Sequence, residues 1–122
     1  MIKAEYKYSE LTAKVIGCAM KVHQKMRSGY PEQIYHRCLI IEFSKEAIYY
    51  DETLVGKRRA DFLIENKVVL EIKAMAELTD AHLAQALNYL EGMNLEIGLL
   101  LNFGSKSLEI KRIINNKARQ SD

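Results

Sequence analysis

Two strand-like segments separated by only three residues constrain the fold more than any other feature of the chain. Residues 58–64 (RRADFLI) and 68–73 (VVLEIK) are rich in the side chains that strands favour, and the ENK between them is typical of a hairpin turn. Strand side chains alternate between two faces, so Asp61 lies on one face of the first strand, and Glu71 and Lys73 share a face of the second. The predicted hairpin therefore carries charge into a sheet, where charge is normally excluded.

The length of the turn decides whether these charged side chains meet. A two-residue turn would put Asp61 on the face of Leu70, whereas a three-residue turn over residues 65–67 pairs Asp61 with Glu71. Asn66 tolerates the left-handed backbone conformation that three-residue hairpin turns use, and a bulge would have the same effect. In that register the two carboxylates stand close together.

Two neighbouring carboxylates resist joint ionisation unless a cation lies between them. Magnesium is the natural candidate, because it takes oxygen ligands from one or two carboxylates and keeps several waters. Lys73 could then hold or activate a water, or stabilise charge on a substrate phosphate. The alternative is an exposed strand face with a cross-strand salt bridge, which stabilises a fold only weakly.

Apolar periodicity predicts the other elements. One helix begins near Ser9 and stops before Gly29, and Pro31 opens a second helix that fades near Lys45. A further helix is expected over residues 79–91, and three more strands are expected, at residues 48–50, 97–103 and 108–114. A polar turn is expected at residues 51–53, after the first of these strands. This order predicts an α/β fold with a single mixed sheet flanked by helices, in which the later helix forms a parallel crossover.

Composition agrees with one ordinary globular domain. The chain has 122 residues, of which 48% are hydrophobic and 28% charged, so we expect a single domain over residues 1–122 with frayed ends at about 1–8 and 115–122. No apolar run is long enough to span a membrane and no apolar signal core begins the chain, which predicts a cytoplasmic protein. Cys18 and Cys38 are expected to be reduced, buried thiols.

Two of the predicted helices carry polar side chains at helical spacing. The stripes consist of Glu32, Tyr35 and His36 in the second helix, and of His82, Gln85 and Tyr89 in the third. Each stripe by itself is most simply a solvated or partly buried face. His23 is expected only on the surface of the first helix.

Taken together, these residues resemble the bacterial GxxExxY protein family, a branch of the PD-(D/E)xK nuclease superfamily, over nearly the whole chain. The naming motif is matched by Gly29, Glu32 and Tyr35 in GYPEQIY, and the nuclease motif by Asp61 in RRADFLIE with EIK at residues 71–73. A QxxxY element is present as Gln85 and Tyr89 within HLAQALNYLEG.

The resemblance implies a restriction-endonuclease-like core and a metal-dependent nuclease. It assigns Mg²⁺, with Mn²⁺ as the alternative, to Asp61 and Glu71, helped by Glu32 and the backbone carbonyl of Ile72. It also implies that Lys73 positions or activates the attacking water, and that Gln85 and Tyr89 orient the site or contact the nucleic-acid backbone. The remaining alternative is a catalytically inactive module on the same fold, binding nucleic acid or a protein.

One departure from the family concerns the segment before Asp61, FSKEAIYYDETLVGKRRAD, which is compressed. It predicts a truncated first strand, an exposed sheet edge at residues 60–64 and self-association through that edge. The truncation would also disturb the approach of Glu32 to the metal.

Basic residues are the candidates for nucleic-acid contact, with DNA favoured over RNA as the partner, although a solvated basic surface explains them equally well. They are Lys57, Arg58, Arg59 and Arg112.

Overall fold

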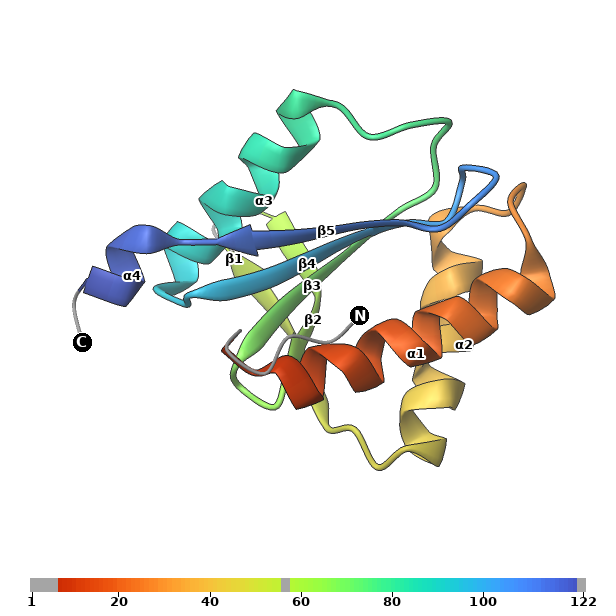
Figure 1. The fold of residues 1–122 in the computed structure, drawn as a ribbon, viewed down its shortest axis with the longest axis horizontal. Coiled ribbons are helices and arrows are strands. Elements are labelled where there is room, and N and C mark those ends of the chain that lie inside the picture. Colours follow the sequence, from red (N-terminus) through yellow and green to blue (C-terminus); the bar gives the residue numbers. More distant parts are fainter. Residues whose placement is uncertain (1–6, 56–57, 121–122) are drawn as a thin grey trace.

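The computed structural model describes residues 7–55 and 58–120, which form one five-stranded sheet between layers of helices (Figure 1). The strands lie in the order of the chain: β1 (Tyr50–Val55), β2 (Arg58–Ile64), β3 (Val68–Lys73), β4 (Ile97–Asn102) and β5 (Glu109–Ile114). Strands β3 and β4 are parallel, and the other neighbours are antiparallel. The predicted α/β fold with a single mixed sheet and a parallel crossover is therefore confirmed.

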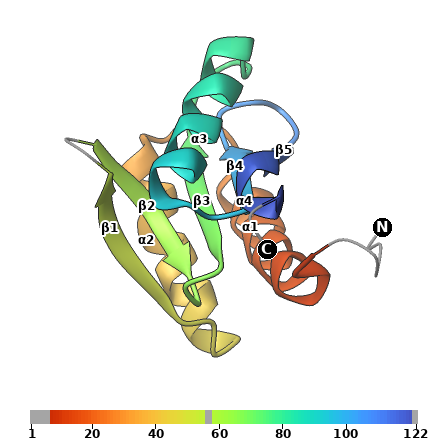
Figure 2. The ribbon, with the colours of Figure 1, turned by 90° about the vertical axis from the view of Figure 1, so that its left-hand side faces the viewer.

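Helices cover both faces of the sheet. Helices α1 (Ser9–Met26) and α2 (Glu32–Lys45) pack on one face, and α3 (Asp80–Met93) packs on the other (Figure 2). A short helix, α4 (Asn116–Gln120), forms within the range that was predicted to be frayed. None of the helices within residues 7–55 and 58–120 is long and apolar enough to cross a membrane.

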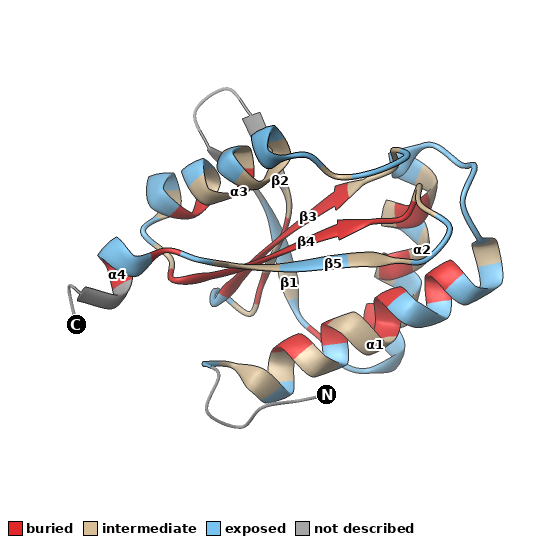
Figure 3. Ribbon diagram, turned by 45° about the horizontal axis from the view of Figure 1, so that its top comes forward, coloured by how far each residue is buried: buried red, intermediate tan, exposed pale blue. Residues whose placement is uncertain are grey.

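The alternation of side chains along β3 divides the core between the two layers. Val68, Leu70 and Ile72 belong to the large cluster beneath α1 and α2, whereas Val69 packs with Leu90 of α3. Because both faces are covered, β3 and β4 are buried along nearly their whole length (Figure 3). Charged side chains on β3 are consequently held in a covered sheet.

The first strand corrects one prediction. Strand β1 is six residues long and includes residues 51–53, which were expected to form a turn. It pairs with β2 from Tyr50↔Ile64 to Val55↔Arg58, with a bulge between Asp51 and Thr53, so residues 60–64 are not an exposed edge. The error has a physical cause: charged residues are tolerated on an edge strand, where one side meets solvent, and in sequence they resemble a polar turn.

The connection between α1 and α2 confirms that the first part of the chain forms two successive helices. Helix α1 ends at Met26, and Arg27 has a positive φ of 62°. Gly29 follows with φ 116°, a region that glycine enters without steric cost. Pro31 precedes α2 in an extended conformation with φ −65°, so the connection over residues 27–31 has a defined shape.

Candidate active site

The pairing of β2 with β3 sets the position of Asp61, the first carboxylate of the nuclease motif. Paired residues are Ile64↔Val68, Leu63↔Val69 and Phe62↔Leu70, which is the register that a three-residue turn predicts. The turn uses left-handed residues at Glu65 and Asn66, with φ 49° and 59°. Continued by one residue, this register would put Asp61 opposite Glu71, but the backbone pairing stops at Phe62↔Leu70.

Beyond Phe62, a hydrogen bond from the Asp61 side chain takes the place of backbone pairing between β2 and β3. Oδ2 of Asp61 accepts a hydrogen bond of 2.6 Å from the backbone N–H of Ile72. A hydrogen bond to a carboxylate is stronger than one between neutral groups, so it fixes the direction of the Asp61 side chain. The carboxylate is thus held at the point where the backbone pairing of β2 and β3 ends.

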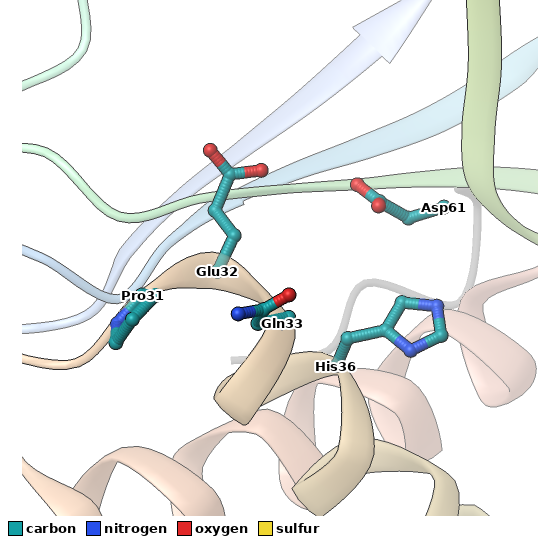
Figure 4. A pocket seen from close by; sticks show the side chains of 5 residues that line it. All are labelled: Pro31, Glu32, Gln33, His36 and Asp61. Atoms are coloured by element: carbon teal, nitrogen blue, oxygen red, sulfur yellow. The ribbon is translucent and has the colours of Figure 1, made fainter.

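Asp61 faces a pocket whose other residues come from the start of α2. The cavity of about 460 Å³ is lined by Pro31, Glu32, Gln33, His36 and Asp61 (Figure 4). In Figure 4 the carboxylates of Glu32 and Asp61 extend from opposite sides into the same space. The pocket therefore joins the predicted helix stripe to the predicted strand motif.

Packing fixes the orientation of His36 at the base of this pocket. Its ring stacks on Phe62 of β2, with centroids 4.4 Å apart and an interplanar angle of 14°. Its Nε2 lies 3.1 Å from Oε1 of Glu52 on β1. In the sequence His36 belongs to a polar helix stripe and has no assigned role, because its contacts with two strands depend on the tertiary fold.

The pKa of Glu32 is shifted by partial burial and by two nearby charges. Partial desolvation raises this pKa above its ordinary value, the nearby ammonium of Lys73 lowers it, and the negative charge of Asp61 raises it further. Glu32 remains exposed to solvent even so. One carboxylate of α2, one of β2 and the lysine of β3 thus form an electrostatically connected group.

The third helix supplies the partner of Lys73. Nζ of Lys73 donates a hydrogen bond of 3.3 Å to Oε1 of Gln85 on α3. Tyr89 is half-buried one turn further along the same helix. Glu71, two residues before the lysine on the same face of β3, is only 4% exposed. The QxxxY stripe and the EIK motif therefore meet between β3 and α3.

A buried asparagine, absent from the sequence-based candidates, holds the chain that follows Lys73. Asn102 at the end of β4 is fully buried; its Oδ1 accepts from the backbone N–H of Met75 at 3.0 Å, and its Nδ2 donates to the carbonyl of Met75 at 2.9 Å. The backbone N–H of Phe103 also donates to the carbonyl of Lys73 at 2.8 Å. A polar residue ending an apolar run was the only signal in the sequence.

The three predicted metal-binding carboxylates do not form a closed ligand set. Among residues 7–55 and 58–120, no three His, Cys, Asp or Glu side chains lie close enough together to hold a metal ion. Glu32 and Asp61 face the pocket, whereas Glu71 is buried in the sheet. Oxygen donors of this kind nevertheless suit Mg²⁺, which needs only one or two carboxylates because it keeps several waters.

Two residues of the first helices have roles other than those expected. Tyr35 is completely buried instead of lying on a polar face, and its hydroxyl donates to the carbonyl of Arg27 at 2.5 Å. His23 is only 6% exposed, and its Nε2 lies 3.0 Å from the carbonyl oxygen of Ser105, so the prediction of a surface position is wrong. Both side chains pack near Phe103, at the end of β4.

Arg112, the basic candidate whose side chain the structure describes, does not line the pocket. Lys57 and the side chains of Arg58 and Arg59 lie outside what the structure describes. The guanidinium of Arg112 donates to Oγ1 of Thr12 at 3.4 Å and to the backbone carbonyl of Lys7, so it links β5 to the start of α1. The two cysteines are free thiols, with Cys18 buried and Cys38 half-buried.

Comparison with known proteins gives one family match. A family model described as the PD-(D/E)XK nuclease superfamily matches residues 9–113, from the first residue of α1 to the penultimate residue of β5. The matched region contains every residue that lines the pocket, together with Glu71, Lys73 and Gln85. No curated protein and no solved structure gave a match.

Proposed function

The chain belongs to the PD-(D/E)XK nuclease superfamily, and from this premise we propose that it hydrolyses phosphodiester bonds of nucleic acid with the help of a divalent metal ion. Nucleases of this superfamily generally use divalent metals. The observation that carries the proposal is the Asp61 carboxylate, held by the backbone of Ile72 and facing Glu32 across an open pocket. Within the superfamily we propose the GxxExxY branch, on the motif of Gly29, Glu32 and Tyr35.

The metal in this proposal is held by oxygen atoms from β2 and β3. Asp61 and Glu71 are the proposed ligands, with the backbone carbonyl of Ile72 beside them and Glu32 reaching in from α2. When bound there, Mg²⁺ or Mn²⁺ would polarise the phosphate and lower the pKa of a water molecule. Support comes from the electrostatic coupling of Glu32 with Asp61 and from the oxygen-only donor set.

Lys73 is the proposed residue for positioning the attacking water. Its ammonium is held by Gln85 and carries protons that can bind a water oxygen or a non-bridging phosphate oxygen. Attack of that water on phosphorus breaks one P–O ester bond and yields a phosphate monoester and a hydroxyl group. In the proposal, Gln85 fixes the direction of Lys73, and Tyr89 contacts the nucleic-acid backbone from the same helix.

A second candidate is a catalytically inactive nucleic-acid-binding module on the same fold. The observation that favours it is the lack of a closed three-carboxylate group in the part of the chain that the structure describes. Such a module would depend on basic residues, among them Lys57, Arg58 and Arg59, and would bind with steep salt dependence and without a metal. In either case we propose DNA before RNA as the partner, and a cytoplasmic location.

Metal binding by calorimetry, run beside cleavage assays on DNA and RNA, separates the two candidates. The nuclease proposal expects wild-type protein to bind Mg²⁺ or Mn²⁺, the Asp61→Asn, Glu71→Gln double variant to lose that binding, and Glu46→Gln at the far end of α2 to retain it. Lys73→Ala should keep the fold and reduce cleavage by about 100-fold or more, unlike the exposed control Lys111→Ala. Salt-sensitive binding of nucleic acid by wild-type protein without metal uptake or cleavage would favour the inactive module.

A further inference from the structure

We propose that Tyr30 is a stacking platform for an unpaired base beside the scissile phosphate, which makes single-stranded or end-frayed nucleic acid the substrate of this site. The inference rests on the proposed function and adds a substrate class to it. Three observations carry it: the exposure of the Tyr30 ring, the way in which that ring is held, and the positive charges next to it.

Tyr30 presents an aromatic ring to solvent immediately next to the pocket. The side chain is 46% exposed, although large aromatic residues are usually buried. It directly precedes Pro31 and Glu32, both of which line the pocket. Two residues of chain span at most about 7 Å, so Tyr30 starts at the rim where the Glu32 carboxylate enters.

The ring is held in place by the core. Tyr30 packs edge-to-face with Tyr35, with centroids 6.1 Å apart and an angle of 83°, and its backbone N–H donates to the Tyr35 hydroxyl at 3.3 Å. Tyr35 in turn stacks on Phe103 at 4.7 Å and donates to the carbonyl of Arg27. Because the platform is already ordered by buried groups, stacking a base on it costs little conformational entropy.

Positive charge lies on the other side of the same connection. A second cavity, of about 370 Å³, has Arg27 and Lys106 in its lining. It brings the α1–α2 connection beside the β4–β5 loop, at one end of the molecule (Figure 1). Both side chains are exposed, and within residues 7–55 and 58–120 neither takes part in an ion pair.

An aromatic ring flanked by cations is the combination that binds single strands. Cations hold the phosphates while each base stacks on a ring, and any base can do so because every base has a π-face. In the proposed path, phosphates contact Arg27 and Lys106 while one base stacks on Tyr30. The next phosphate then reaches the pocket where Glu32 and Asp61 would hold the metal ion that neutralises it. A duplex could use Tyr30 only by unstacking a base, which costs free energy.

The test measures binding of single-stranded and blunt duplex DNA that carry the fluorescent base 2-aminopurine, in a Lys73→Ala background to limit cleavage. Stacking on Tyr30 should quench the fluorescence of the single strand. Tyr30→Ala should abolish the quenching and weaken single-strand binding by about 5- to 100-fold, whereas Tyr30→Phe should retain both. Tyr30→Leu keeps most of the side-chain volume without the ring and should behave like Tyr30→Ala.

Tyr49 provides the matched control for these variants. Its side chain is 74% exposed, and its carbonyl accepts a hydrogen bond of 2.9 Å from the backbone N–H of Glu65, in the β2–β3 turn. Because this turn is at the end of the hairpin away from Asp61, Tyr49→Ala should change neither the quenching nor the single-strand affinity. Equal single-strand affinity and persistent quenching in Tyr30→Ala and Tyr30→Leu would overturn the inference while leaving the nuclease proposal intact. If wild-type protein neither binds nor cleaves nucleic acid, the proposed function itself fails, and the inference fails with it.

Discussion

The carboxylate of Glu32 is influenced by the negative charge of Asp61 and the ammonium of Lys73, and its proton affinity changes as a result. Partial desolvation is the main cause of its raised pKa. A raised pKa means that the folded protein binds the proton more tightly than the unfolded chain does. The protonated carboxyl group therefore adds to the free energy of unfolding. This contribution is fully present below pH 4.5, the ordinary pKa of a glutamate, and is lost as the pH rises through the raised pKa of the folded protein.

Replacing Glu32 with glutamine should therefore stabilise the fold at neutral pH. We expect Glu32→Gln to raise the free energy of unfolding at pH 7, by less than about 1 kcal/mol because solvent screens an exposed group. The gain should disappear below pH 4.5, where the carboxyl group is protonated in both states. Thermal melts across this pH range measure the effect, and Glu46→Gln serves as the control. A loss of stability at pH 7 would mean that the ionised carboxylate is net favourable.

At the scale of elements, close backbone contact holds the connection between β3 and α3. A Cβ atom on Gly104, just beyond β4, would lie 2.2 Å from the backbone nitrogen of Met75. The N–H of Gly104 also donates to Oδ1 of Asn102, the residue that holds Met75. Because Met75 lies two residues after Lys73, this contact helps to place the proposed catalytic lysine.

A pair of glycine substitutions tests that contact. Gly104→Ala must displace backbone, so we expect it to destabilise the protein by about 1–3 kcal/mol and to reduce cleavage. Gly17→Ala in α1 has no atom within 4 Å of the added Cβ and should stabilise the protein by about 0.5–1 kcal/mol. Urea denaturation measures both changes. Equal effects of the two substitutions would show that the close approach to Met75 is easily relieved.

Over the whole molecule, the two free edges of the sheet belong to β1 and β5. Asp51 and Glu52 are exposed on β1, and Lys111 is exposed on β5. Charged side chains discourage another strand from pairing with an edge. The edge at residues 60–64, from which self-association was predicted, is covered by β1.

We accordingly expect the protein to be monomeric at micromolar concentrations. Sedimentation velocity over a hundred-fold range of concentration should give one species with the mass of a single chain. Lys111→Thr, which removes an edge charge and introduces a strand-favouring residue, should increase any association that occurs. A stable wild-type dimer would contradict this expectation, and its response to Lys111→Thr would indicate whether β5 forms the interface.

The sequence by itself determined the features that depend on local spacing. The two-residue period of strands limited the β2–β3 register to the alternatives that a two- or three-residue turn allows, because both quantities are properties of residues 58–73 alone, and the structure has the three-residue turn. Helical periodicity located α1, α2 and α3 for the same reason. The close approach of Asp61 to Glu71 that this register would allow stays a prediction, because the backbone pairing ends at Phe62↔Leu70.

Tertiary structure alone decided which faces are buried and which distant residues meet. Tyr35 is in the core because Phe103 from the end of β4 stacks on it, and a helical stripe does not specify which neighbour covers it. Edge position explains why the charges of β1 were mistaken for a turn. The contact of Lys73 with Gln85 and the pocket shared by Glu32 and Asp61 arise only when the helices pack on the sheet, because these residues are far apart in the chain.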